Sequence, residues 1–437
     1  MATKDNVLLS SDPVFKDVLL EMLEGCRDLR EATARMSETV LNALMSMQAD
    51  EACGAPWGER SEERVNSRNG YRERGLSTTA GDLTLEVPKL RKGTYFPDDI
   101  LRRWGRADAA LAAAITEMYV QGVSTRKVEA VARKLGLDSM SSSRVSSMCA
   151  SLDAEVDEFR TRPLGWQRWC YLWLDATWVK CRVEGRSVSQ AIVTAIALGE
   201  DGCKHFCGAD VMDTESYADW DRFLANLRDR GLDGVQLVVS DAHGGLKRAI
   251  AERFQGASWQ RCYVHLMRDV AGHVRNRHDQ ARAVELLRAV FAQRDPLVAR
   301  AALRRAAGEI ESFSPAAAAC LAGAQEDCLV YMDFPSSHWR KIRTNNVQER
   351  ANREIKRRAK VVQSFPSRGS LVRLVGAVLI GEEDAWSQRR MFSREVTAEA
   401  WNERRRPVPT ELELKTAERR AADVVCVSSS RFEQNVH

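Results

Sequence analysis

Residues 169–183, WCYLWLDATWVKCRV, and residues 235–241, VQLVVSD, decide the fold of this chain. Each is an apolar run rich in β-branched or aromatic residues, which predicts a buried strand. Asp175 comes directly after the apolar run 171–174, and Asp241 comes directly after Ser240. We therefore expect two strands that each end at an aspartate.

The segments around these two strands complete the pattern of an α/β domain. Two further strands are predicted at 187–198 and 204–212, after turns at 184–185 and 201–202. A helix is predicted at 215–231, before the 235–241 strand. Another helix is predicted at 244–254 and a fifth strand at 257–265. Three strands followed by helix, strand, helix and strand predict a mixed sheet covered by helices, the order of the ribonuclease H-like fold. In that fold the first and fourth strands lie side by side.

The residues before this domain predict a mainly helical region with a basic hairpin. Apolar residues at helical spacing predict one or two helices within 13–50, and alternation in 66–97 predicts the hairpin. Residues 122–152 are similar to a helix-turn-helix, with caps at Ser124 or Thr125 and at 141–143 and a turn at Gly136. The alternative is any pair of packed helices. If the motif binds DNA, the side chains expected to contact it are Arg126, Lys127 and Arg144.

The two aspartates suit a divalent cation. If their strands are neighbours, the carboxylates lie within a few ångströms and repel each other unless a cation lies between them. Ligands that are all oxygen favour Mg²⁺ or Mn²⁺. Cleavage of a polynucleotide can use two such ions, so a third acid is expected. The alternative for each aspartate is a simple turn or cap residue.

The helix expected from about Asn345 supplies the third acid. Asn345, Glu349, Asn352 and Lys356 share one face at helical spacing, which makes Glu349 the candidate. Glu354 is the rival, although it lies about 140° around the helix. Glu349 could instead merely pair with Arg353.

Basic residues concentrate around this helix. From Arg340 to Arg368 there are ten Lys or Arg residues against two Glu, whereas the net charge of the chain is only +4. Such a segment can bind phosphates, although a solvated face would look the same. The expected DNA contacts here are Arg350, Arg353, Lys356, Arg357 and Arg358.

Composition describes an ordinary globular protein. The chain has 437 residues, of which 44% are hydrophobic and 29% charged. We expect no membrane span and no secretory signal, hence a cytoplasmic protein, which would be associated with the nucleoid if it binds DNA. Its eleven cysteines include no C-x-x-C pair and are expected to be reduced.

Several separated motifs resemble the Mutator-type transposases of bacterial insertion sequences. They are NGYRER, LEVPKLRKGTYFP, MYVQGVSTRKV, LDATWVK, VVSDAHGGLKRAI, WQRCYVHLMRD, RTNNVQERANREIKRR and VVQSFPSRGS, spread from about Asn69 to Phe392. The resemblance implies a ribonuclease H-like catalytic domain with an Asp-Asp-Glu triad and an all-helical insertion. Carried over by motif, the triad falls on Asp175, Asp241 and Glu349.

The same resemblance draws attention to a cysteine–histidine signature, here Cys262 and His265. Zinc would need two further ligands, and none follows at suitable spacing, so a site-supporting role is favoured, together with Asn345 and Asn352. Trp259 and Trp339 are candidates for stacking on distorted bases, although a core position is the commoner fate of tryptophan.

These observations predict six segments and one activity. The segments are N-terminal helices for dimerisation or DNA contact (1–65), a DNA-binding region (66–165), a catalytic domain in two parts (166–269 and 338–395), a helical insertion (270–337) and a polar tail (396–437), loosely ordered after Arg404. The expected activity is cleavage of the terminal inverted repeats of an insertion sequence and joining of the 3′-hydroxyl to target DNA by a dimer or higher oligomer. The alternatives are a transposase-derived DNA-binding protein and a metal-dependent nuclease without strand transfer.

Overall fold

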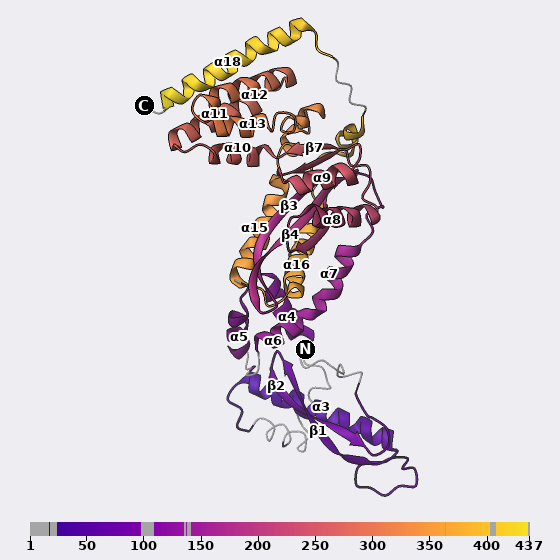
Figure 1. Cartoon of the computed structure of the whole chain (residues 1–437). Helices are drawn as coiled ribbons and strands as arrows, with labels where there is room; N and C mark the ends of the chain where they lie inside the picture. Colours follow the sequence, from indigo (N-terminus) through magenta and orange to yellow (C-terminus); the bar gives the residue numbers. More distant parts are fainter. Residues whose placement is uncertain are drawn as a thin grey trace, which may run out of the picture. The chain divides into compact units, whose positions relative to one another are not determined.

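The chain divides into two compact units, Met1–Ser151 and Leu152–His437. The structure, a computed structural model, describes residues 17, 24–97, 109–134, 137, 141–362, 364–402 and 408–435 (Figure 1). Apart from residue 17, the part of the predicted N-terminal helices before residue 24 lies outside the described residues, as does the predicted turn at Gly136.

The first unit contains a helix packed on a two-stranded hairpin. Helix α3 (Leu29–Cys53) begins at Asp28, whose side chain accepts a hydrogen bond from the Glu31 backbone N–H. Strands β1 (Arg68–Thr78) and β2 (Gly81–Leu90) pair in antiparallel fashion, which confirms the predicted hairpin. Every second residue of β2 from Leu83 to Val87 is buried. Leu83, Leu85 and Val87 form one apolar cluster with Met45 of α3.

Three short helices complete the described part of this unit. They are α4 (Ala109–Val120), α5 (Thr125–Lys134) and α6 (Ser142–Met148), followed by the 3₁₀ turn η1 (Cys149–Ser151). The Ser124 and Ser141 hydroxyls accept hydrogen bonds from the Lys127 and Arg144 backbone N–H groups, as the predicted caps require. An apolar cluster that includes Ile115, Val128 and Val145 holds the three helices together.

The second unit is built on a five-stranded mixed sheet in the order β5-β4-β3-β6-β7. Its strands are β3 (Trp169–Val183), β4 (Arg186–Gly199), β5 (Lys204–Met212), β6 (Leu237–Ser240) and β7 (Ser258–Arg261). The first three strands are antiparallel, whereas β6 pairs in parallel with both β3 and β7. The predicted order of elements is confirmed, and so is the predicted contact between the first and fourth strands.

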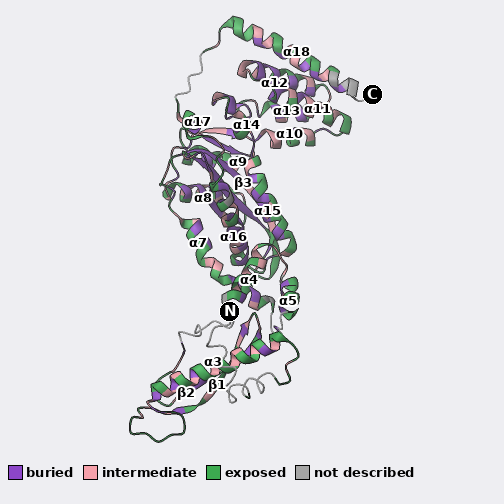
Figure 2. Cartoon of the chain, turned by 180° about the vertical axis from the view of Figure 1, so that it is seen from behind, coloured by how far each residue is buried: buried purple, intermediate pink, exposed green. Residues whose placement is uncertain are grey.

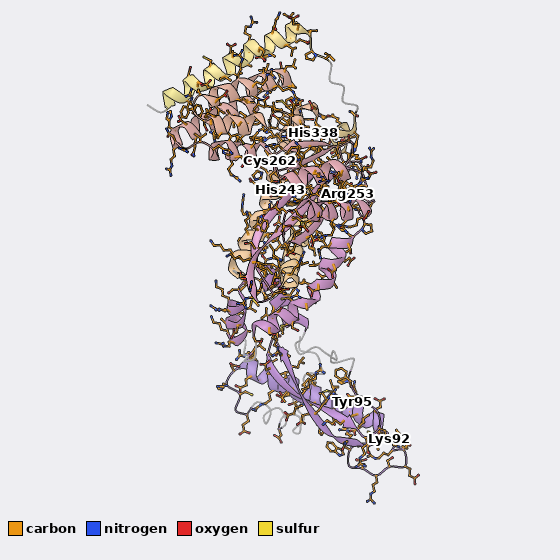
Figure 3. The ribbon with its side chains drawn as sticks, viewed as in Figure 1. Lys92, Tyr95, His243, Arg253, Cys262 and His338 are labelled. Carbon is orange, nitrogen blue, oxygen red and sulfur yellow. The ribbon has the colours of Figure 1, made fainter. Side chains whose placement is uncertain are left out.

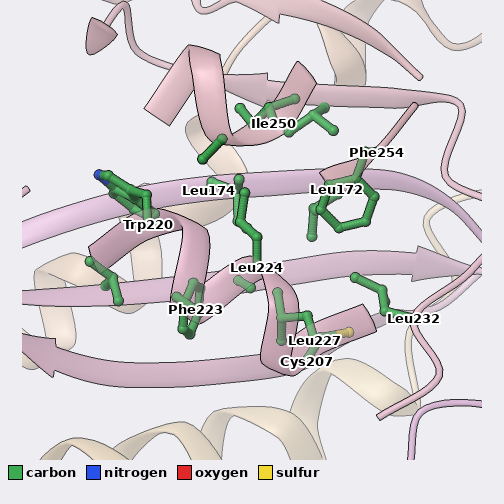
Figure 4. Close-up of a cluster of buried hydrophobic side chains, with 14 of the residues drawn as sticks. Leu172, Leu174, Cys207, Trp220, Phe223, Leu224, Leu227, Leu232, Ile250 and Phe254 are labelled. Carbon is green, nitrogen blue, oxygen red and sulfur yellow. The ribbon is translucent and has the colours of Figure 1, made fainter. Parts of the chain in front are cut away.

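Helices cover both faces of this sheet, and its strands are largely buried (Figure 2). Helices α8 (Tyr217–Asp229) and α9 (Gly244–Arg253) pack on one face through a large apolar cluster that includes Leu172, Leu174 and Trp220 (Figure 4). Helices α15 (Asn346–Val362) and α16 (Arg368–Ser387) contact β3, with α15 also against β4 and α16 also against β5. Helix α7 (Leu152–Thr161) packs against α16, where Asp153 accepts two 2.7 Å hydrogen bonds from Arg373.

The chain between β7 and α15 is helical. Its elements are α10 (Tyr263–Gly272), α11 (Arg277–Phe291), α12 (Pro296–Glu311), α13 (Pro315–Ala322), η2 (Val330–Asp333) and α14 (Trp339–Ile342). After α16 come α17 (Arg394–Ala398), η3 (Glu399–Trp401) and α18 (Glu411–Asn435). The prediction of a loosely ordered tail is therefore wrong, because α18 is a 25-residue helix that packs on α11 and α12.

None of the helices in the described ranges is both long enough and apolar enough to cross a bilayer.

Candidate active site

Asp175 lies within β3 rather than at its end. The strand continues to Val183 because β4 pairs with it along that whole length, so the expectation that Asp175 closes the strand is wrong. The parallel pairing with β6, however, stops at Trp173 and Val239. Asp175 therefore lies just beyond the end of β6, where Asp241 follows Ser240.

The two aspartates act on each other electrostatically. Burial and the negative charge of Asp241 raise the pKa of Asp175 to about 7. The Ala176 backbone N–H, Lys356 and the Asn352 amide oppose that rise. The structure thus brings together the first two predicted acids, in an arrangement that disfavours two simultaneous negative charges.

Helix α15 is fixed over Asp175 by side-chain amides. Asn345 Nδ2 donates to the Leu174 carbonyl oxygen at 2.9 Å, and Gln348 Nε2 donates to the Trp173 carbonyl oxygen at 2.7 Å. Asn352 Nδ2 donates to the carboxylate of Asp175 itself. Two of these anchors, Asn345 and Asn352, are the site-supporting residues predicted from the helical face.

Glu349 lies on α15 between the anchors Asn345 and Asn352, four residues from one and three from the other. Its side chain is exposed, whereas those of Asn345 and Asn352 are buried. Among the described residues, no group of three His, Cys, Asp or Glu side chains is arranged to hold a metal ion. The structure thus places Glu349 on the helix over the site but does not assemble the predicted triad.

The rival acid Glu354 is engaged elsewhere. Its carboxylate contacts Arg358 at 2.6 Å and Arg357 at 3.1 Å. Burial alone would raise the pKa of Glu354, but the two guanidinium groups lower it overall. Glu354 is therefore the structural partner of these two arginines.

Cys262 connects the elements of the site. Its backbone N–H donates to the Ser240 carbonyl oxygen at 2.8 Å, and its Sγ accepts from the Asn345 backbone N–H at 3.2 Å. Burial is the main cause that raises the pKa of its thiol, which favours the neutral form.

His265 follows in the first turn of α10, and its buried Nδ1 has no hydrogen-bond partner in the described part of the chain. Figure 3 labels Cys262 together with His243, the residue that precedes α9.

The two predicted stacking residues have partners within the protein. Trp259 donates to Ser240 Oγ at 2.9 Å, and Lys247 Nζ lies 4.4 Å from the centre of its ring. Trp339 donates to the Phe334 carbonyl oxygen at 2.7 Å. Both side chains are half-buried, so each at least stabilises the fold around the site.

The predicted DNA-binding cations differ in their surroundings. On α15, Arg353 and Lys356 are exposed, whereas Arg350 contacts Glu382 at 3.2 Å. In the first unit, Arg126 and Lys127 are exposed on α5. Arg144 donates to Ser77 Oγ of the hairpin at 2.6 Å.

Glu215, just before α8, is an acid that the sequence did not single out. It accepts a 2.7 Å hydrogen bond from Trp178 Nε1. Burial raises its pKa and Asp241 raises it further, which places its charge near the candidate site. No local sequence pattern marks Glu215, because it comes close to Asp241 only when β5 and β6 join one sheet.

The donor atoms at this site fit a hard divalent cation. Asp175 and Asp241 supply carboxylate oxygens, and the buried Oδ1 atoms of Asn345 and Asn352 have no hydrogen-bond partner among the described residues. Oxygen ligands of this kind favour Mg²⁺ or Mn²⁺. A cation near Asp175 would remove the repulsion between the two aspartates.

The fold and the site define a mixed α/β protein with paired acids at the edge where parallel strands end. A family model described as transposase, Mutator family, matches residues 17–389. The chain belongs to the Mutator family of transposases.

Curated relatives agree with this assignment. The transposase for insertion sequence element IS1081 of Mycobacterium tuberculosis is 41% identical over 355 residues, which cover 81% of this chain and 85% of the relative. The transposase for insertion sequence element IS256 in transposon Tn4001 of Staphylococcus aureus is 37% identical over 350 residues, which cover 80% and 89%.

A solved structure, the Drosophila P element transposase strand transfer complex, matches with 15% identity and a TM-score of 0.24. The match covers 40% of this chain and 47% of that chain, and the similarity is too low to define the fold.

Proposed function

We propose that this transposase binds the terminal inverted repeats of an insertion sequence, cleaves the element ends by metal-dependent hydrolysis and joins the freed 3′-hydroxyl to target DNA. The observation that carries the proposal is the electrostatic interaction of Asp175, within β3 just beyond its parallel pairing with β6, with Asp241, which follows β6. A ribonuclease H-like catalytic domain is part of the proposal, supported by the side-by-side position of the first and fourth strands.

Each residue of the site has a role in this proposal. Asp175 and Asp241 would hold the cation, and the exposed side chain of Glu349 on α15 would supply the third carboxylate. Asn345 and Asn352 fix the helix and Asp175, while Cys262 ties the end of β6 to the start of α15. Bound Mg²⁺ or Mn²⁺, expected as two ions, would supply activation of the attacking water and stabilisation of the leaving oxygen.

The DNA partner is proposed from charge and exposure. Arg353 and Lys356 extend from the helix that carries Glu349, and Arg126 and Lys127 are exposed on α5. Exposed cations of this kind bind backbone phosphates and release counterions. Because the two ends of the insertion sequence must be processed together, the active form is proposed to be a dimer or a higher oligomer on DNA.

The test is cleavage and joining of labelled element-end DNA with Mg²⁺ or Mn²⁺. Asp175→Asn, Asp241→Asn and Glu349→Gln should each abolish both reactions, with losses of about 10³-fold or more, while DNA binding survives. Glu354→Gln is the matched control, because it removes a carboxylate from the same helix and should keep the activity.

Three outcomes would contradict parts of the proposal. Activity in Glu349→Gln would remove that residue from the site. Cleavage without joining by the wild type would favour a plain nuclease. Binding without cleavage under either metal would favour a transposase-derived DNA-binding protein.

A further inference from the structure

A small pocket opens beside the start of α15, separate from the paired aspartates. Its volume is about 280 Å³, and its lining residues are Lys204, Asn346, Val347, Arg350, Trp386 and Arg389. One water molecule occupies about 30 Å³ in the liquid, so the pocket has room for a group of several heavy atoms. Three elements of the second unit form it, because Lys204 begins β5, Asn346 begins α15 and Trp386 lies near the end of α16.

The charge of this pocket is strongly positive. Lys204, Arg350 and Arg389 line it, and Lys341 is close enough to act on Lys204. One carboxylate opposes them, since Glu382 contacts Arg350 at 3.2 Å and also acts on Lys204. In the described part of the chain, no carboxylate lies within ion-pair distance of Lys204 or Arg389.

Trp386 holds Lys204 in the pocket. The Lys204 Nζ lies 4.0 Å from the centre of the Trp386 ring, and Trp386 in turn stacks on Phe206 at 4.7 Å. Burial is the largest cause that lowers the pKa of Lys204, followed by repulsion from Arg350 and Lys341. An ammonium group that is partly dehydrated and repelled by its neighbours is stabilised by an anion.

The start of α15 adds a further preference for an anion. Asn346 and Val347 are its first residues. The Asn346 N–H donates to Thr344 Oγ1 at 3.4 Å, and the amino end of a 17-residue helix carries a partial positive charge. The same turn of α15 carries Glu349. An anion bound in the pocket would therefore lie next to the proposed third acid.

We propose that this pocket binds a backbone phosphate of the DNA substrate and so fixes the strand next to the active site. The inference rests on the proposed function for its partner, DNA, but not on cleavage. Phosphate fits better than a carboxylate because it presents several oxygens to cations that come from β5, from α15 and from the segment just after α16.

The test measures binding of full-length protein to a labelled DNA duplex over a series of salt concentrations. A phosphate contact contributes about 0.9 to the slope of log K against log salt. Lys204→Gln and Arg389→Gln should each lower that slope by up to about 1 and weaken binding about fivefold near physiological salt, for any duplex sequence. Arg389→Lys should restore most of the loss.

Arg222→Gln is the matched control. Arg222 lies on α8, which packs against the opposite face of the sheet, and its removal changes the net charge by the same amount. Its salt slope should equal that of the wild type.

The outcomes separate this inference from the proposed function. A lower slope in the pocket variants but not in Arg222→Gln supports the phosphate pocket, even if the wild type never cleaves DNA. Pocket variants with the slope of Arg222→Gln overturn it, even if cleavage is intact. A wild type that binds no duplex overturns it as well.

Discussion

At the residue scale, the pKa of the Asp175 carboxyl is set by opposing interactions. Burial and Asp241 raise its pKa to about 7, while the Ala176 N–H, Lys356 and Asn352 oppose them. The ordinary pKa of an aspartate is about 3.8, so between pH 3.8 and about 7 the folded protein binds more protons than the unfolded chain. Stability therefore falls as pH rises through that window.

Asp175→Asn should remove this fall. Without divalent cations, the variant should melt about 5 °C above the wild type at pH 8 and at nearly the same temperature at pH 4. Thermal unfolding in a chelating buffer across this pH range measures the effect. Adding Mg²⁺ should then stabilise the wild type and leave the variant nearly unchanged. Parallel pH profiles for the two proteins would show that Asp175 does not titrate in this range.

Glu215 adds a second residue-scale prediction. Its charge acts on Asp241 while Trp178 holds its carboxylate, so it should strengthen the attraction of the site for a cation. Glu215→Gln should raise the Mg²⁺ concentration needed for half-maximal thermal stabilisation roughly tenfold. Glu158→Gln, at an exposed position of α7, is the control. An unchanged Mg²⁺ dependence would separate Glu215 from the site.

At the scale of elements, the local patterns of the chain predicted most of the second unit. The runs in β3, β4, β5 and β6 are apolar enough to mark strands without any tertiary information. The position of Asp175 inside β3 was not predictable locally, because β4 is what extends that strand to Val183. The nearness of Glu215 to Asp241 also depends on long-range pairing. The candidate pair Asp175 and Asp241 was predictable because each directly follows an apolar run of a strand, 171–174 in β3 and 237–240 in β6.

Helix α18 was missed because charged residues outnumber large apolar ones along it. The helix nevertheless packs on α12, and its buried residues include the small Ala417 and Ala421. Ala421→Asp should lower the free energy of unfolding of the second unit by about 3 kcal/mol, because it buries an unpaired charge. Val427→Asp is the matched control, since Val427 is 49% exposed on the same helix. Equal stability of the two variants by chemical denaturation would show that α18 does not pack as described.

At the scale of the whole molecule, the chain combines two compact units whose proposed tasks differ. The candidate metal site and the phosphate pocket lie in Leu152–His437, whereas the hairpin and the helices α4 to α6 lie in Met1–Ser151. Each unit has its own apolar clusters, which favours separate unfolding steps over a single cooperative one. A ligand that binds one unit should then stabilise that unit alone.

Calorimetry of the full chain should therefore resolve two transitions. Mg²⁺ at about 100 times its dissociation constant contributes about 2.7 kcal/mol and should raise only the transition of the second unit, by about 5 °C. Leu85→Ala should lower only the other transition, because Leu85 is fully buried against α3 in the first unit and its truncation costs about 3 kcal/mol. Asp175→Asn in the presence of Mg²⁺ tests the origin of the first shift, which should disappear. A single transition displaced by both Mg²⁺ and Leu85→Ala would mean that the two units unfold as one. Cation binding at Asp175 and Asp241 would then stabilise the whole chain.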